Sequence, residues 1–315
     1  MVRAPREWPM NQFYIIANSE KDKNLETTKQ IYDYLTAHGK SCTVREYQKA
    51  EEVCLNQGDA KKESLNAYIS YGLPVGYTNA DWIPEGTECI LVLGGDGTLI
   101  QAARDTVDRG IPLLGINLGN LGYLAEIEKS GIVDALDSLM ADAYTLEPRM
   151  MLEGTVCRKG SGDIHNLALN DIVVNRAGAL RVIDYEIYVN GEFLNRYSAD
   201  GIIVSTPTGS TGYSLSAGGP IVSPMASMIV VTPICPHTLT ARSIVLSGED
   251  QVTIRLGSGR RVEQEEAFAT FDGEVSVPIA TGDYVEIRKS EKTADILKIS
   301  KISFLEVLRN KMRGN

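Results

Sequence analysis

The sequence predicts an α/β N-terminal domain with a mostly parallel sheet, followed by a predominantly antiparallel all-β C-terminal domain. Three observations predict this fold class. The chain has 315 residues, which suits about two domains. Strand-like and helix-like segments alternate up to residue 143, a pattern typical of a parallel sheet covered by helices. Residues 144–315 consist almost wholly of strand and turn patterns, although the extreme C-terminal segment could pack back on the first domain.

Apolar periodicity places the elements of the first domain. Residues 12–18 (QFYIIAN) form a short apolar run that predicts a buried strand, and the next segment has apolar residues at helical spacing that stops at Gly39. Helices are expected at residues 23–38, 98–109 and 131–142, and strands at residues 12–18, 41–47, 88–93 and 111–117. Residues 50–86 contain Pro74, Pro84 and several glycines and are expected to be an excursion with weak structure of its own.

Turn signals divide the second domain into strands. Asn190-Gly191 lies between two strand-like runs and is the strongest short hairpin signal. A second turn, at residues 257–259, contains two glycines. Strands are expected at residues 150–158, 164–175, 183–189, 192–197, 252–256, 262–271, 284–290 and 294–299.

Composition excludes several classes of protein. The chain has 31 basic and 41 acidic residues, a net charge of −10, and no basic stripe, so we expect no nucleic-acid partner. No apolar run approaches the length of about 20 residues that spans a membrane. Five scattered cysteines without C-x-x-C spacing favour reduced thiols rather than disulfides or a zinc site. Residues 1–10 lack the apolar core of a signal peptide, so we expect a cytoplasmic protein. No residue is assigned as a metal ligand from its spacing.

The most informative segment of the first domain is Gly94-Gly-Asp-Gly-Thr98. A buried strand runs into it and a helix follows, so it lies at the carboxyl end of a parallel strand, where such sheets bind ligands. Gly95 and Gly97 let a ligand approach the backbone, and the helix start offers N–H groups to an anion. Asp96 would repel a phosphate, so it suggests a base for a hydroxyl, an anchor for a metal, or both. The alternative is a helix cap on a tight turn.

Two further segments carry polar side chains at strand ends. Residues 115–124 follow the neighbouring strand, so this glycine-rich loop is expected on the same rim as Asp96. Asn170-Asp171 precedes an apolar strand; the pair is either a simple turn or a recognition site for a sugar diol, which needs both acceptors and donors.

Residues 205–216 are mostly Ser and Thr, which is unusual inside a globular domain. A buried strand leads into the segment, and Pro207 argues against a flexible linker. Its hydroxyl and N–H groups, with the ring of Tyr213, suit a flat polar ligand. The chain has no G-x-x-x-x-G-K-[ST] and no G-x-S-x-G, which excludes a P-loop and the usual hydrolase elbow. His237 in Pro233–His237 is best explained as structural.

Taken together in this order, the segments at 94–98, 117–124, 170–171 and 200–220 resemble the ATP-NAD kinase family over residues 12–306. Members phosphorylate the adenosine-ribose 2′-hydroxyl of NAD to give NADP. The resemblance implies ATP as phosphoryl donor, Mg²⁺ as cofactor, NAD as the other substrate, and a homo-oligomer, dimeric or tetrameric. It also implies that the second domain binds NAD.

Carried over by position, the resemblance makes Asp96 the catalytic base for the 2′-hydroxyl. It implies nucleotide contacts at Gly95, Asp96, Gly97, Asn170, Asp171, Arg181, Asp200, Thr211, Gly212, Tyr213, Ser214 and Ser216. Gln101, Gly212 and Glu274 depart from the residues commonest in the family. Two rivals stay open: a diacylglycerol-type lipid kinase or sugar kinase that shares the G-G-D-G signature, and a dinucleotide-binding sensor without activity.

Overall fold

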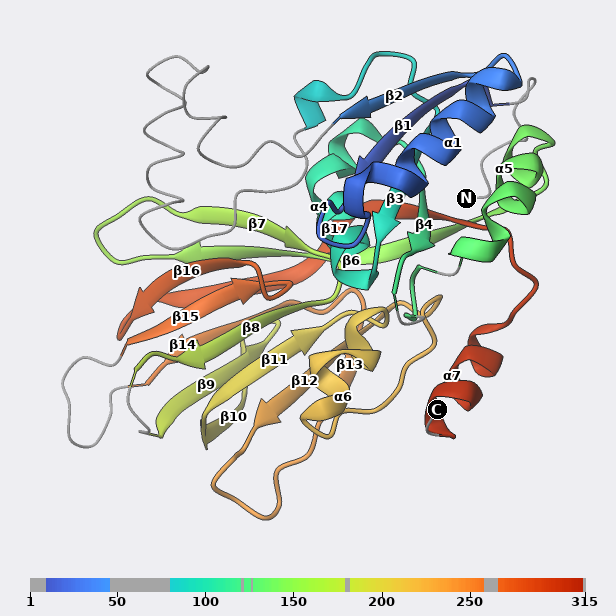
Figure 1. Cartoon of the computed structure of the whole chain (residues 1–315). Helices are drawn as coiled ribbons and strands as arrows, with labels where there is room; N and C mark the ends of the chain where they lie inside the picture. Colours follow the sequence, from blue (N-terminus) through green and yellow to red (C-terminus); the bar gives the residue numbers. More distant parts are fainter. Residues whose placement is uncertain are drawn as a thin grey trace. The chain divides into compact units, whose positions relative to one another are not determined.

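The computed structural model describes residues 10–45, 80–119, 122–125, 127–178, 182–257 and 266–313 (Figure 1). The chain divides into two compact units. Unit 1 combines Met1–Pro148 with Ala294–Asn315, and unit 2 is Arg149–Thr293. Unit 1 carries the parallel strands and most of the helices, and unit 2 is built from antiparallel strands, so the predicted fold class is confirmed.

Unit 1 is built around parallel strands in the spatial order β2-β1-β3-β4. Beyond β4 lie β5 and the end of β17, where Ile296 pairs with Leu113. The strands are β1 (Gln12–Ala17), β2 (Ser41–Arg45), β3 (Cys89–Gly94), β4 (Leu113–Asn117) and β5 (Ile127–Glu128), and the helices are α1 (Glu26–Ala37), α4 (Asp96–Thr106), α5 (Ile132–Met140) and α7 (Phe304–Met312). Short 3-10 turns, among them η1 (Lys23–Leu25), η2 (Ala80–Trp82), η3 (Val107–Arg109) and η4 (Lys129–Gly131), adjoin these elements.

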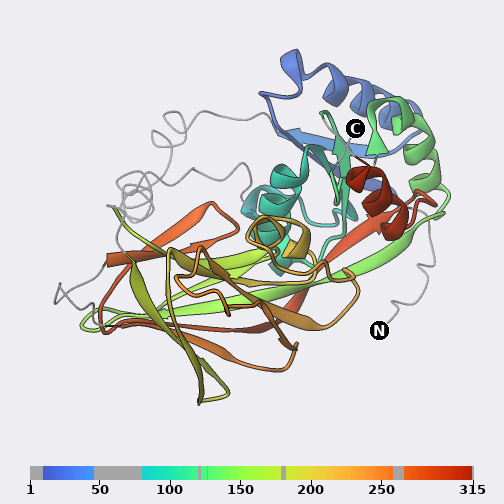
Figure 2. The same ribbon diagram turned by 90° about the horizontal axis from the view of Figure 1, so that it is seen from below.

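Successive side chains of a strand point to opposite faces of the sheet, and this explains how the helices cover it. Phe13 and Ile15 of β1 join Leu91 of β3 in a buried cluster with Ile31 of α1 and Leu136 of α5. These two helices contact each other and share one face, whereas α4 packs on β3 and β4 (Figure 2). Each fully buried aliphatic side chain contributes about 1.5–3 kcal/mol to folding. The apolar pattern of β1, β3 and β4 therefore fixes where the polar residues at their carboxyl ends emerge.

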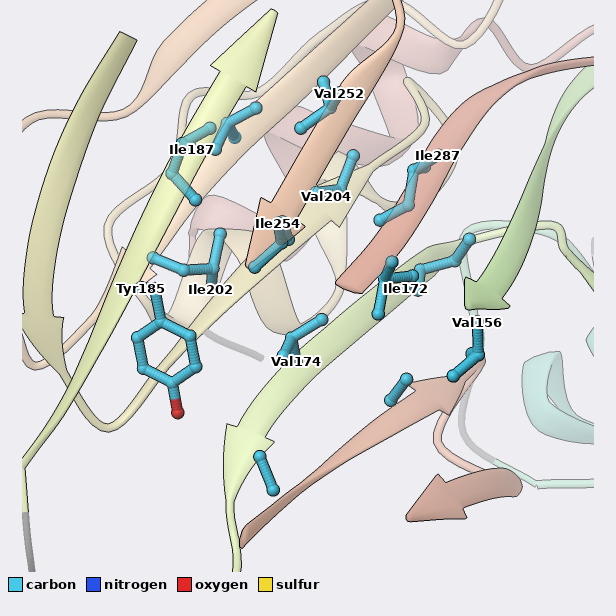
Figure 3. Close-up of a cluster of buried hydrophobic side chains, with 14 of the residues drawn as sticks. Val156, Ile172, Val174, Tyr185, Ile187, Ile202, Val204, Val252, Ile254 and Ile287 are labelled. Carbon is cyan, nitrogen blue, oxygen red and sulfur yellow. The ribbon is translucent and has the colours of Figure 1, made fainter. Parts of the chain in front are cut away.

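Unit 2 contains two sets of antiparallel strands with a shared core. One set runs β10-β9-β14-β17, with the β6–β7 hairpin beside β17, and the other runs β13-β12-β11-β8-β15-β16. Figure 3 shows the core between them, where Ile187 and Ile254 of the first set meet Val174 and Val204 of the second. The strands are β6 (Thr145–Cys157), β7 (Ile164–Ala168), β8 (Asp171–Arg176), β9 (Ile183–Val189), β10 (Glu192–Ala199), β11 (Gly201–Ser205), β12 (Met228–Ile234), β13 (Ile244–Ser247), β14 (Val252–Leu256), β15 (Glu266–Phe271), β16 (Val275–Ala280) and β17 (Tyr284–Lys298).

Most predicted elements are present, and several differ; strands β12, β13 and β16, for example, were not predicted. The Asn190-Gly191 hairpin is confirmed, with both residues at positive φ between β9 and β10. The strand expected at residues 164–175 is broken into β7 and β8 at residues 169–170, and the two strands expected at residues 284–299 are one strand, β17. Helix α7 was not predicted. Most of the excursion at residues 50–86 lies outside the described residues.

Candidate active site

The glycine-rich loop after β3 has the geometry that the sequence predicts. Strand β3 is buried throughout, and α4 begins at Asp96 with Gly95 as its extended N-cap residue. Gly94 has no room for a side chain, because a Cβ there would lie 2.4 Å from Thr98 Oγ1. That hydroxyl also accepts a hydrogen bond from Asn18 Nδ2 at 3.2 Å, which ties the loop to the end of β1.

The second glycine-rich loop lies against the first. Gly94 pairs with Asn117 in the parallel ladder, and Leu118 N donates to Gly94 O at 2.8 Å, so both loops leave the sheet at one rim as predicted. Asn117 Oδ1 accepts a hydrogen bond from Gly119 N at 2.8 Å and shapes the start of this loop. Asn120 lies outside the described residues.

The Asp96 carboxylate binds the backbone of the second loop. Its Oδ2 accepts from Tyr123 N at 2.7 Å, and its Oδ1 accepts from Leu124 N at 3.2 Å and Ala125 N at 3.0 Å. Gly122 makes this approach possible, since a Cβ at that position would lie 1.9 Å from Asp96 Oδ1. Sequence reasoning gave this carboxylate a role toward a ligand; the structure adds a second role, that of holding the loop at residues 122–125.

A cation that sequence reasoning missed lies beside this loop. A Cβ on Gly95 would be 2.6 Å from Lys21 Nζ, so the ammonium group lies directly over the glycine. Lys21 follows β1 by a few residues, and its backbone N–H donates to Asn18 O at 3.0 Å. The signal was available, because a lysine just past the carboxyl end of a parallel strand lies at the rim where such sheets bind ligands. Together with the N-terminus of α4, Lys21 favours an anion here.

In unit 2, Asn170 lies in a turn held by the Ser/Thr-rich segment. Its carbonyl accepts from Thr206 N at 2.8 Å, while Thr206 Oγ1 donates to Leu169 O at 2.6 Å. Gly209 packs so closely that a Cβ would lie 2.1 Å from Asn170 O, and Gly212 lies near Asn170 Nδ2. The structure therefore brings two of the predicted segments together, with residues 209–212 packed on the Asn170 turn.

Asp171 is a buried carboxyl group at the start of β8. Its side chain is 6% exposed, and it faces Ser205 of β11 across the ladder. Burial, and secondarily the negative charge of Asp272, raise the pKa of Asp171 from 3.8 to about 7. A carboxyl group that titrates near neutral pH is a frequent feature of functional sites.

Two buried polar atoms in this region have no hydrogen-bond partner among the described residues. These are Asn170 Oδ1 and Thr208 Oγ1. Since buried polar atoms in folded proteins are nearly always paired, these atoms suggest a bound water or ligand as the partner.

The Ser/Thr-rich segment is ordered and is not a flexible linker. It folds into two short helical turns, η5 (Gly209–Thr211) and α6 (Tyr213–Ser216). Several hydroxyls serve the segment itself: Ser210 Oγ binds Pro207 O and Val222 N, and the buried Ser214 Oγ lies 3.2 Å from Thr232 Oγ1. Tyr213 and Ser216 are exposed, and Thr211 and Gly212 are half-buried. The exposed members are therefore the better placed to meet a ligand.

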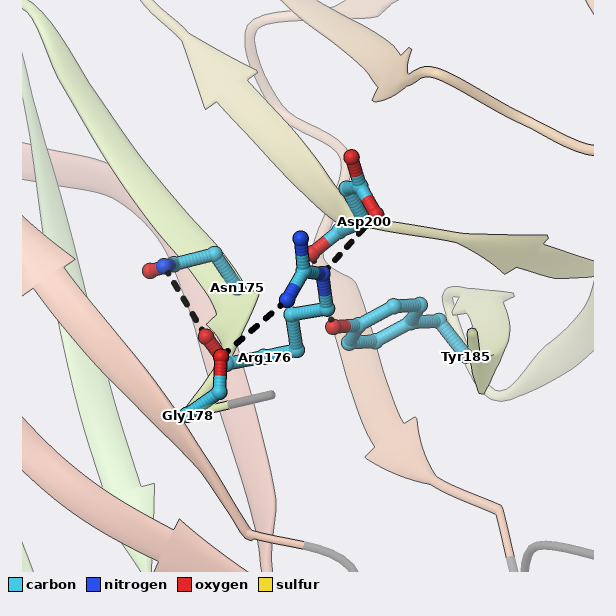
Figure 4. A network of polar contacts seen from close by, with 5 residues as sticks. All are labelled: Asn175, Arg176, Gly178, Tyr185 and Asp200. Carbon is cyan, nitrogen blue, oxygen red and sulfur yellow. Dashed lines mark hydrogen bonds and ion pairs between the residues drawn. The ribbon is translucent and has the colours of Figure 1, made fainter. Parts of the chain in front are cut away.

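Asp200 lies between β10 and β11 and forms an ion pair with Arg176. Arg176 Nε lies 2.8 Å from Asp200 Oδ1, and the hydroxyl of Tyr185 donates to Asp200 O at 3.2 Å. Figure 4 shows these residues together. Arg176 was not singled out from the sequence, although its position at the end of β8 was a usable signal. Arg181, which the family resemblance implied as a nucleotide contact, lies outside the described residues.

The described residues contain no group of three or more His, Cys, Asp and Glu side chains placed to hold a metal ion. Within the same part of the chain, no helix is long and apolar enough to cross a membrane.

Comparison with known proteins shows the class of protein to which this chain belongs, a two-domain kinase. A family model described as the ATP-NAD kinase N-terminal domain matches residues 13–144, and one described as the C-terminal domain matches residues 169–299. The NAD kinase of Lachnospira eligens is 45% identical over 312 residues, covering 96% of this chain and all of that protein. The NAD kinase of Agathobacter rectalis is 45% identical over 306 residues, 97% and 99% of the two chains. The chain belongs to the ATP-NAD kinase family and is therefore an enzyme.

Solved structures share the fold. Yeast NADH kinase complexed with NADH superposes with a TM-score of 0.80 at 24% identity, covering 98% of this chain and 89% of that one. An NAD kinase from Archaeoglobus fulgidus in complex with ATP has a TM-score of 0.68 at 24% identity, covering 96% and 98%.

Proposed function

We propose that this enzyme transfers the γ-phosphoryl group of ATP to the 2′-hydroxyl of the adenosine ribose of NAD, forming NADP. The observation that carries the proposal is the 45% identity to NAD kinases over nearly the whole chain. Two solved relatives support the substrates, since one holds NADH and the other ATP.

In this proposal Asp96 is the general base. It would orient the 2′-hydroxyl and take its proton as the oxygen attacks the γ-phosphorus. Its position at a glycine-bounded strand end suits that task, because neither neighbour has a Cβ that would keep a sugar away. Since the carboxylate accepts three backbone N–H groups in this structure, it must give up or share some of them to reach a hydroxyl.

Positive charge near the loop at residues 94–98 would attract the phosphates of ATP. Lys21 and the N-terminus of α4 provide it, and Mg²⁺ would arrive with ATP, because this ion usually keeps several waters and binds through substrate phosphates. Phosphoryl transfer has a loose transition state, so positioning and charge neutralisation carry most of the catalysis. We also propose that the nucleotide contacts are those implied by the family, Gly95, Gly97, Asn170, Asp171, Arg181, Asp200, Thr211, Gly212, Tyr213, Ser214 and Ser216.

The role of Asp96 is tested with Asp96→Asn. The amide cannot take a proton, so we expect kcat to fall about 10²–10⁴-fold. NAD affinity, measured by calorimetry, should stay within a few-fold of wild type. Undiminished turnover would refute the assignment of the base. If NAD binding were lost together with turnover, Asp96 would instead be a residue that holds the loop at 122–125.

A further inference from the structure

The turn between β15 and β16 carries an aspartate whose side chain points back along the sheet to another loop. Asp272 and Gly273 have φ values of 51° and 73°, and Glu274 N donates to Phe271 O at 3.0 Å, which is a type I′ hairpin turn. Asp-Gly is a preferred pair for such a turn. The turn alone does not require a carboxylate, however, because Asn-Gly or Gly-Gly would form it equally well.

The Asp272 carboxylate accepts three backbone hydrogen bonds from the turn between β7 and β8. Its Oδ2 accepts from Leu169 N at 2.9 Å, and its Oδ1 accepts from Asn170 N at 2.7 Å and from Asp171 N at 3.2 Å. A fourth bond joins the same two turns, since Asp272 N donates to Asp171 O at 2.9 Å. Bonds from N–H groups to a charged acceptor are stronger than neutral ones. This contact lies at the break between β7 and β8, where the sequence predicted one strand at residues 164–175.

The turn at residues 169–171 is thus held from two directions. Asp272 binds its N–H groups, whereas Thr206 binds the carbonyl oxygens of Leu169 and Asn170. The described residues leave Asn170 Oδ1 buried without a hydrogen-bond partner, beside the loop at residues 209–212. Asn170 Oδ1 is therefore an acceptor that is available to a ligand, on a backbone that is already fixed in position.

We propose that Asp272 is a positioning residue for dinucleotide binding, in which its carboxylate fixes the backbone that presents Asn170 and Asp171 to NAD. This inference rests on the proposed function, because it assumes that Asn170 and Asp171 contact NAD. Asp272 itself acts through the turn and need not touch the ligand.

The charge of Asp272 adds a second, separable effect. It contributes, after burial, to the raised pKa of Asp171 of about 7. Among the described residues, Tyr213 of α6 also interacts with Asp171: its pKa is raised first by burial and then by the charges of Cys235, Asp171 and Asp200. Only an ionised carboxylate accepts hydrogen bonds through both oxygens. NAD affinity should therefore increase as pH rises through about 7, and loss of the Asp272 charge should move this increase to lower pH.

The experiment compares Asp272→Asn and Asp272→Glu with wild type. NADP formation is followed from about pH 5 to pH 9, which spans the titration of Asp171. Asp272→Asn replaces two accepting oxygens by one and removes the charge, so we expect KM for NAD to rise about tenfold. We expect kcat to stay within about threefold of wild type, because the reacting groups remain. The midpoint of the pH dependence of kcat/KM should fall, because the Asp272 charge helps to raise the pKa of Asp171. Asp272→Glu keeps the charge, so its midpoint should stay at the wild-type value even where KM rises.

Asp283→Asn is the matched control. Asp283 is likewise a turn carboxylate of unit 2 that binds backbone N–H groups; it is 8% exposed and accepts from Lys159 N at 2.7 Å and from Ala280 N at 2.9 Å. Its contacts do not include residues 169–171. The Asp283→Asn variant should therefore lower Tm as Asp272→Asn does, without changing KM for NAD or the midpoint of the pH dependence of kcat/KM.

The outcomes separate this proposal from the proposed function. A wild type that forms NADP, with Asp272→Asn unchanged in KM and pH midpoint, overturns the positioning role and leaves the function standing. Equal changes in KM for Asp272→Asn and Asp283→Asn also overturn it, since both would then act through stability. A wild type that neither binds NAD nor forms NADP overturns the function and this inference with it.

Discussion

At the scale of single residues, two carboxylates organise loops by accepting backbone hydrogen bonds. Asp96 binds N–H groups 27 to 29 positions later in the chain, and Asp272 binds N–H groups 101 to 103 positions earlier. The sequence marked Asp96 because a lone carboxylate among glycines is unusual. It gave no such sign for Asp272, whose Asp-Gly pair is fully explained as a hairpin turn. Acceptors so far from their donors cannot be found by reading local patterns.

The raised pKa of Asp171 can be tested by measuring how the stability of the fold depends on pH. Its pKa is about 7 in the folded protein against an ordinary value of 3.8, so between these pH values the native state holds a proton that the unfolded chain releases. The contribution of Asp171 to the free energy of unfolding therefore declines as pH rises from 3.8 to about 7. Above about pH 7 this contribution is constant. Asp171→Asn removes this dependence.

We therefore expect Asp171→Asn to raise Tm relative to wild type more at about pH 8 than at about pH 5. Thermal unfolding at the two pH values measures this, with Asp283→Asn as the comparison for a carboxylate that accepts backbone hydrogen bonds elsewhere in unit 2. The same Tm difference at both pH values would show that the carboxyl group is not held protonated in the fold.

At the scale of elements, apolar periodicity predicted the buried strands, but it missed features that depend on contacts between distant parts of the chain. The run at residues 12–18 is β1, and the Asn190-Gly191 turn joins β9 to β10. The break between β7 and β8 escaped prediction because the side chains that bind this turn, Asp272 and Thr206, lie far away in the sequence. Helix α7 was missed although Phe304, Val307, Leu308 and Met312 recur at helical spacing, and none of its residues is buried in the structure.

The cap of α7 shows what holds such a helix. Ser303 Oγ accepts from Glu306 N at 3.2 Å, and Lys311 Nζ lies 5.0 Å from the ring centre of Tyr123. Leu305 and Met312 are 69% and 73% exposed, so packing contributes little. Ser303→Ala should destabilise α7 by about 1 kcal/mol. Hydrogen exchange should then speed up in residues 304–312 while the global Tm changes little. Unchanged exchange in these residues would contradict the assignment of the cap.

At the scale of the whole molecule, the order of the segments was more informative than any one of them. The G-G-D-G loop is common to several kinases, but it is followed here by the loop at residues 115–124, the Asn170-Asp171 turn and the Ser/Thr-rich segment in family order. The two family models match the same stretches. The homo-oligomer and the cytoplasmic location expected from the sequence stay predictions.

Charge at this scale constrains the chemistry. The chain carries a net charge of −10, yet both proposed substrates are anions. Backbone N–H groups, Lys21 and the Mg²⁺ that accompanies ATP would then have to supply the attraction. The sequence showed the excess of acidic residues but not that Lys21 lies over Gly95. That placement depends on the parallel pairing of β1 with β3, which brings the ends of two distant segments together.

The most direct test of the central claim is a product assay. Wild-type enzyme is incubated with NAD, ATP and Mg²⁺, and the product is identified with an NADP-specific dehydrogenase and by ³¹P NMR of the 2′-phosphate. We predict stoichiometric formation of NADP and ADP, abolished by chelation of Mg²⁺. If NAD bound without giving NADP, with either ATP or polyphosphate as donor, the enzyme would be a dinucleotide sensor. If instead a diacylglycerol or a free sugar were phosphorylated, the proposed acceptor would be wrong.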